Sequence, residues 1–166
     1  MPDTKNNRHT NEHVARLLHE VTLAYHRFTA AASRQRGMGV TELRALGYLR
    51  DEGALTPGSL GERLAITGAS VTALVDRLET GGYAHRVPHS HDRRSLLVEL
   101  TPSGRLEVGT LFELLASDVN AAVEGMAPVE QDAVVRFLGA MIDCFEQRTT
   151  VIPAGDGSSL RLDGKP

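Results

Sequence analysis

"LTPGSLGERLAITGASVTALVDRLETGGY", residues 55–83, reads as two short helices joined by a tight turn. Thr56 is a good N-cap and Pro57 suits the first helical position, which predicts a helix over 57–64. After the turn, Thr67 can cap a second helix over 68–80, ended by two glycines. The sides expected to be buried carry leucine and valine at helical spacing: Leu60, Leu64, Val71, Leu74, Val75 and Leu78. This is a helix-turn-helix pattern.

A hairpin with a charged tip follows directly. "YAHRVP" (83–88) and "SLLVEL" (95–100) read as strands on either side of "HSHDRR" (89–94). The net charge of the chain is −3, yet residues 63–105 hold six arginines against four acidic residues, a local charge of +2. A basic segment within an otherwise acidic chain indicates that residues 63–105 bind an anionic partner.

Long amphipathic helices are expected on both sides of this segment. One runs from Asn11 to about Ser33, and Thr41 is expected to cap the next, which ends at Gly53. Pro102 starts a helix that runs toward Met126, and Pro128 starts the last one. The apolar stripes of the terminal helices are too long for so small a core, so these helices are expected to pack with each other and with a second subunit.

The predicted fold class is mainly α with a small β wing, a winged helix-turn-helix with N- and C-terminal dimerisation helices. Residues 1–10 are expected to form a flexible N-terminus and residues 149–166 a flexible tail. Residues 11–36 and 102–148 are assigned to dimerisation, and residues 37–101 to the winged domain.

The composition also bears on membrane association, thiol chemistry and metal binding. The apolar runs are far shorter than the ~20 residues needed to span a bilayer, so a soluble, cytoplasmic protein with no membrane partner is expected. The single Cys144 cannot form an intramolecular disulfide, and beside its apolar neighbours it is expected to be buried and inert. The histidines lack a convincing ligand spacing, so no metal site and no cofactor are expected.

Residues 38–105 resemble the MarR family of bacterial transcription regulators, on the motifs "SVTALVDRLETGGYAHR" (70–86) and "HDRRSLLVELTPSGR" (91–105). The resemblance implies a homodimer bound to a pseudo-palindromic site in double-stranded DNA, with a recognition helix of each subunit in the major groove and a wing arginine in the minor groove. Arg94 is the first choice for insertion, Arg93 the second, and Asp92 would orient the inserted side chain. The residues expected at DNA are Thr67, Gly68, Ala69, Ser70, Thr72, Ala73, Arg77, His91, Asp92, Arg93 and Arg94.

The resemblance also implies a ligand-responsive repressor. Family members commonly bind small aromatic or phenolic acids between the dimerisation helices and the winged domain, and the residues proposed to line such a site are Tyr25, His26, Tyr48 and Arg86. Both tyrosines could equally be core residues, and Arg86 could be a structural ion-pair partner.

Two other classes of function are compatible with a winged helix. A winged helix can serve protein–protein interaction or dimerisation without binding DNA, and some enzymes use one only to dimerise. The chain has no Gly-rich cofactor loop, nucleophile elbow or catalytic carboxylate pair, so no enzymatic activity is expected.

Overall fold

A computed structural model of the chain describes residues 4–89 and 95–151. It forms two compact units, residues 1–115 and 116–166. The first unit contains α1 (Thr4–Gln35), α2 (Val40–Asp51), α3 (Pro57–Leu64), α4 (Gly68–Thr80), β1 (Ala84–Pro88), β2 (Leu96–Leu100) and the start of α5 (Pro102–Val123). The second contains the end of α5 and α6 (Pro128–Val151). The predicted fold class, mainly helical with a two-stranded wing, is confirmed.

The helix-turn-helix forms as its caps predict. The Thr56 hydroxyl accepts a hydrogen bond from the Ser59 N–H at 3.1 Å, and the Thr67 hydroxyl accepts one from the Ser70 N–H at 3.4 Å. Between the two helices, Ala65 takes the left-handed conformation (φ 55°, ψ 47°), which lets the chain reverse direction within a few residues.

The wing is an antiparallel hairpin. Its register runs from Ala84 opposite Leu100 to Pro88 opposite Leu96. Leu55 adds an isolated bridge to Val98, with N–H to carbonyl distances of 3.0 and 2.7 Å in the two directions. The hairpin is therefore held at its inner edge by the segment that leads into α3.

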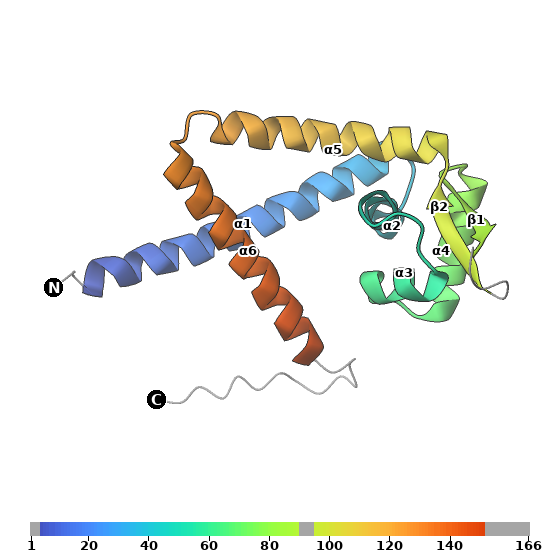
Figure 1. Cartoon of the computed structure of the whole chain (residues 1–166), viewed down its shortest axis with the longest axis horizontal. Helices are drawn as coiled ribbons and strands as arrows, with labels where there is room; N and C mark the ends of the chain where they lie inside the picture. Colours follow the sequence, from blue (N-terminus) through green and yellow to red (C-terminus); the bar gives the residue numbers. More distant parts are fainter. Residues whose placement is uncertain (1–3, 90–94, 152–166) are drawn as a thin grey trace. The chain divides into compact units, whose positions relative to one another are not determined.

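One apolar core joins α2, α3, α4, the hairpin and the start of α5 (Figure 1). Leu46, Leu60 and Val75 are fully buried in it, and Val98 and Val108 bring in the hairpin and α5. Phe28 and Tyr48 pack against it from α1 and α2. Burial of such side chains stabilises the fold by about 1.5–3 kcal/mol each. The core fixes α4 with one side inward and the other exposed.

Three boundaries differ from the sequence prediction. Helix α1 begins at Thr4, so it covers residues expected to form a flexible N-terminus. The N-cap of α2 is Gly39 rather than Thr41, because the Glu42 carboxylate accepts a hydrogen bond from the Gly39 N–H at 2.9 Å. Helix α6 continues to Val151, beyond the predicted start of the tail. Within the described ranges, no helix is both long enough and apolar enough to cross a membrane.

Candidate nucleic-acid interface

Helix α4 has two distinct sides. Val71, Leu74, Val75 and Leu78 are buried, as predicted. The opposite side exposes small or polar residues, one cation and one carboxylate: Gly68, Ala69, Ser70, Thr72, Ala73, Asp76, Arg77 and Thr80, with Thr67 exposed at the N-cap. A helix with this pattern can approach another molecule closely along its exposed side.

The start of α4 presents hydroxyl groups at the surface. The hydroxyls of Thr67 and Ser70 lie 3.0 Å apart, and the Thr72 hydroxyl donates to the Gly68 carbonyl at 3.2 Å. A Cβ atom built on Gly68 would meet nothing within 4 Å, so the space beside this residue is open. Hydroxyls and unpaired N–H groups at a helix N-terminus can bind phosphate oxygens or base edges.

Arg86 ties the wing to α4. Its backbone N–H and its Nη1 group both donate to Glu79, the former at 2.8 Å, and Nη2 donates to Asp76 at 2.7 Å. The hydrogen bond to Asp76 and the charges of Glu79 and Asp76 raise the pKa of Arg86 above its usual value, although burial acts in the opposite direction. The structural reading of Arg86 is therefore confirmed, and its guanidinium holds β1 against the end of α4.

Arg77 also makes an ion pair. Its Nε atom lies 2.5 Å from Oε1 of Glu42 on α2. Burial acts to raise the pKa of Glu42, but the hydrogen bonds from Arg77 and Gly39 and the charge of Arg77 outweigh it, so the pKa lies below its usual value. Glu42 is thus ionised at neutral pH and is bound to both the turn before α2 and the exposed side of α4.

The wing-tip residues named from the sequence, His91, Asp92, Arg93 and Arg94, lie outside the described residues. The strands on either side end at Pro88 and Leu96. Their proposed DNA contacts are taken up under the proposed function.

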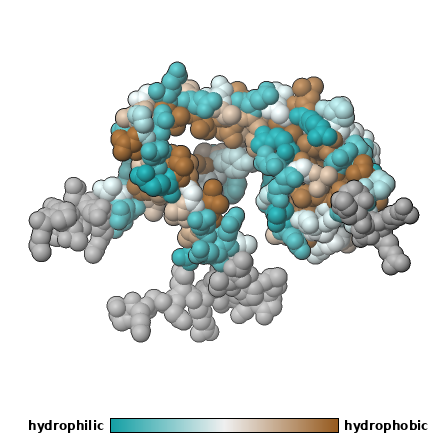
Figure 2. Space-filling view, in the orientation of Figure 1, coloured by the Kyte–Doolittle hydropathy of each residue, from teal (hydrophilic) through white to brown (hydrophobic). Residues whose placement is uncertain are grey.

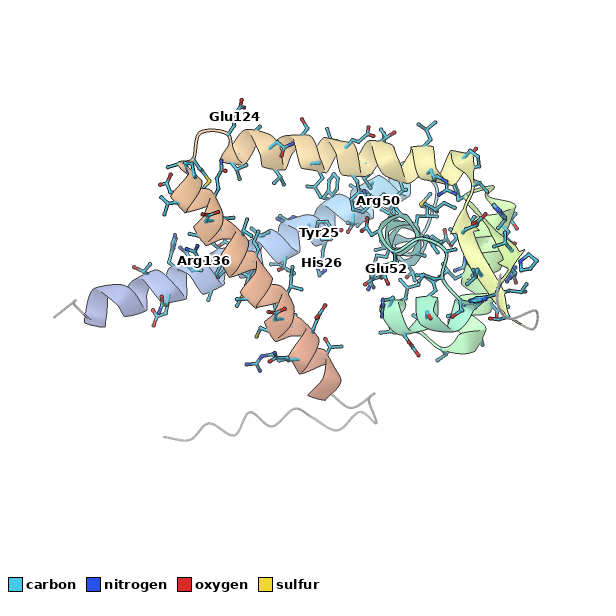
Figure 3. The ribbon with its side chains drawn as sticks, viewed as in Figure 1. Tyr25, His26, Arg50, Glu52, Glu124 and Arg136 are labelled. Atoms are coloured by element: carbon cyan, nitrogen blue, oxygen red, sulfur yellow. The ribbon has the colours of Figure 1, made fainter. Side chains whose placement is uncertain are left out.

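A second candidate site is a cavity of about 540 Å³ lined by α1, α2 and α5. Tyr25, His26 and Tyr48, three of the four residues proposed for an effector, line it. Figure 3 labels Tyr25 and His26 on α1. Arg86, the fourth, is not among the residues that line this cavity; its side chain binds Asp76 and Glu79.

Sequence reasoning missed several residues of this cavity. Phe112 of α5 forms part of the wall, with the guanidinium of Arg50 3.3 Å from the centre of its ring. Gly47 also lines the wall and faces this ring, with a Cβ atom built on it lying 3.4 Å from the ring, at ordinary contact distance. Arg50 also pairs with Asp51 at 2.6 Å, whereas the exposed Arg44 at the cavity has no ion-pair partner among the described residues. The cavity can take a compact apolar molecule and offers one available cation.

Two further expectations concern metal and thiol chemistry. Among the described residues, no group of three or more histidine, cysteine or acidic side chains is arranged to hold a metal ion. Cys144 is only partly buried in the single chain, so the prediction of a buried thiol is wrong for the chain by itself. The apolar neighbours that suggested burial include Phe145, which is itself 55% exposed.

Comparisons with known proteins agree with this geometry. The sequence pattern of the MarR family matches residues 36–95. The HTH-type transcriptional regulator YcgE of Bacillus subtilis is 30% identical over 72% of this chain and 78% of its own length. The multiple antibiotic resistance protein MarR of Salmonella typhimurium is 36% identical over 59% of this chain and 68% of its own length.

The chain is also similar to a transcriptional repressor and to a protein whose structure is solved in complex with DNA. The HTH-type transcriptional repressor YetL of Bacillus subtilis is 31% identical over 68% of this chain and 66% of its own length. The crystal structure of Streptococcus pneumoniae FabT in complex with DNA superposes with a TM-score of 0.66 at 23% identity, over 85% of this chain and 98% of FabT. The chain belongs to the MarR family of winged helix-turn-helix, DNA-binding transcription regulators, a family without enzymatic activity.

Proposed function

We propose that the chain is a homodimeric, sequence-specific regulator that places α4 in the major groove of a pseudo-palindromic site. The exposed start of α4 carries this proposal, because Thr67, Ser70 and Thr72 present hydroxyls beside small residues on a helix whose other side is fixed in the core. Residues 37–101 form the DNA-binding domain in this proposal, and residues 11–36 and 102–148 provide the dimer contacts. The contacts assigned to α4 are Thr67, Gly68, Ala69, Ser70, Thr72, Ala73 and Arg77.

Exposed apolar side chains on the terminal helices support the dimer. Val21 is 64% exposed on α1, Leu106 73% on α5 and Ile142 57% on α6. Figure 2 shows hydrophobic side chains at the surface over α5. Many large apolar side chains exposed on a helix are costly in water and typically mark an interface, so a second copy of the chain is proposed to cover those of the terminal helices.

The wing is proposed to bind the minor groove. In the sequence, one aspartate and two arginines, Asp92, Arg93 and Arg94, follow each other between the two strands. A narrow minor groove concentrates negative potential and attracts a guanidinium. Arg94 is proposed to insert, with Arg93, His91 and Asp92 beside the groove.

The regulator is proposed to repress and to respond to a ligand. YetL, to which the chain is similar, is a repressor. The apolar cavity with Tyr25, His26 and Tyr48 suits a small aromatic or phenolic acid, with the available Arg44 to bind the carboxylate.

The DNA proposal is tested with duplexes selected by the purified protein from a random library. Arg94→Ala is expected to weaken binding of the selected duplex while the dimer stays folded, and the affinity of the unaltered protein should fall steeply with salt. Arg136→Ala, which removes the same charge from α6, is the control and should bind normally. If no duplex is selected, the winged helix serves protein interaction or dimerisation instead.

The effector proposal is tested by thermal unfolding with a panel of small aromatic acids. Binding should raise the melting temperature and reduce DNA binding. Arg44→Ala should abolish the shift, whereas Arg34→Ala on α1, an exposed arginine outside the cavity, should retain it. A shift that survives Arg44→Ala would contradict the role given to Arg44.

A further inference from the structure

Arg77 is the one basic residue of α4, and a fixed carboxylate holds it. The Arg77 side chain is 58% exposed, whereas that of Glu42 is only 14% exposed. Glu42 is fixed by its second oxygen, which accepts the Gly39 N–H at 2.9 Å. The exposed Arg77 therefore binds a carboxylate that is itself held by the backbone N–H of Gly39.

The contact uses only one edge of the guanidinium. Nε of Arg77 donates to Glu42, and neither terminal nitrogen has a hydrogen bond to another residue that the structure describes. Arg63 provides a contrast, because its Nε and Nη2 atoms both bind Glu52, at 2.9 Å each. An arginine held through Nε alone keeps its two terminal nitrogens available as a fork that matches a phosphate.

The neighbouring acidic side chains leave this fork available. Asp76 and Glu79, the two carboxylates of α4, both bind Arg86. Arg77 also lies seven residues after Ser70 and four after Ala73, so the three share the exposed side of the helix.

We propose that Glu42 is a positioning residue for DNA binding, which holds Arg77 by Nε so that its terminal nitrogens face a backbone phosphate. The inference rests on the proposed function. An arginine ordered before binding loses less rotamer freedom on contact, and this gain outweighs the repulsion between the Glu42 carboxylate and DNA. Glu42 does not touch DNA itself.

The test is a double-mutant cycle on the selected duplex, with dissociation constants measured by fluorescence anisotropy. Glu42→Gln keeps an acceptor for the Gly39 N–H and so preserves the cap of α2. It should weaken binding by about 2- to 5-fold when Arg77 is present. In the Arg77→Ala background the same change should leave binding unchanged or tighten it slightly, because only the loss of negative charge remains.

Two results would overturn the inference. Tighter binding by Glu42→Gln in the presence of Arg77 would mean that Glu42 competes with DNA. An equal change in both backgrounds would mean that Glu42 acts through the fold or through its charge alone. Glu52→Gln, which removes a paired carboxylate from the other end of α2, is the matched control and should not weaken binding.

If Glu42→Gln fails to fold, Arg77→Lys tests the inference in its place. Arg77→Lys retains the positive charge but lacks the fork, so it should bind the selected duplex more weakly than the unaltered protein at the same salt concentration. Binding equal to that of the unaltered protein would also overturn the inference. Selection of a duplex by the unaltered protein tests the proposed function separately.

Discussion

The crossing of the two helices of the helix-turn-helix depends on Gly61. A Cβ atom at this position would lie 2.7 Å from Cγ2 of Val71, about 0.7 Å closer than the 3.4 Å at which ordinary contact begins. Val71 is 2% exposed and β-branched, so it has little freedom to turn away. Gly61→Ala should therefore push α3 and α4 apart or strain Val71.

The cost follows from two opposing effects. Overpacking of this kind costs about 1–3 kcal/mol, while Ala at a helical position returns about 0.5–1 kcal/mol relative to Gly. Gly61→Ala should thus lower the free energy of unfolding by about 1–2 kcal/mol. Because Val71 belongs to α4, any relief by movement of that helix should also weaken binding of the selected duplex.

A second substitution makes the reasoning testable. Val71→Ala alone removes two buried methyl groups and should cost about 2–3 kcal/mol. It also removes the atom that a new Cβ at position 61 would meet. In the Val71→Ala background, Gly61→Ala should therefore be neutral or stabilising.

Urea unfolding measures the free energy of unfolding of the unaltered protein, the two single variants and the double variant. The protein concentration is kept fixed, since the stability of a dimer depends on concentration. A Gly61→Ala protein as stable as the unaltered one would refute the steric argument. So would an equal loss of stability in both backgrounds.

Three further predictions concern stability. Ser33→Ala should leave the protein as stable or make it more stable by about 0.5–1 kcal/mol, because the buried Ser33 hydroxyl has no hydrogen-bond partner among the residues that the structure describes; a clear loss in urea unfolding would contradict this. Gly104→Ala should cost about 3 kcal/mol or more, because a Cβ atom would lie 1.9 Å from the Tyr83 carbonyl oxygen, whereas Gly109→Ala, with nothing within 4 Å, should gain up to about 1 kcal/mol. The pKa of Glu42 is lowered by folding, so the stability that it contributes is present at neutral pH and is lost as the pH falls from 4.5 through its lower folded value. Glu42→Gln should accordingly lose less stability than the unaltered protein when the pH is lowered from about 5 to about 3 in urea unfolding.

Local signals made the helix-turn-helix predictable. Thr56 before Pro57, and Thr67 before a run with leucine and valine at helical spacing, each specify a helix start within a few residues. The inward side of α4 follows from the same spacing, since every residue on it is buried. The hydroxyl of Thr41 makes it an attractive N-cap in the sequence, but Gly39 caps α2, because Glu42, three residues later, accepts its N–H as in a capping box.

The cavity could be predicted only in part, because it depends on which helices meet. Tyr25 and His26 are four residues or fewer from Phe28 on α1, but nothing local indicates that Phe112 of α5 faces them. The role of Arg86 could not be predicted from the sequence, because an arginine in the middle of a strand suits either an effector ligand or a structural ion pair. Its two carboxylate partners lie seven and ten residues away, on another element.

The Arg86 contacts have a consequence for how the protein would adapt to its target. The Arg86 guanidinium links β1 to the last turns of α4 through Asp76 and Glu79. We therefore expect β1 and α4 to move together as one block. If the chain forms the proposed dimer, adaptation to half-sites at slightly different spacings would fall to segments outside this block.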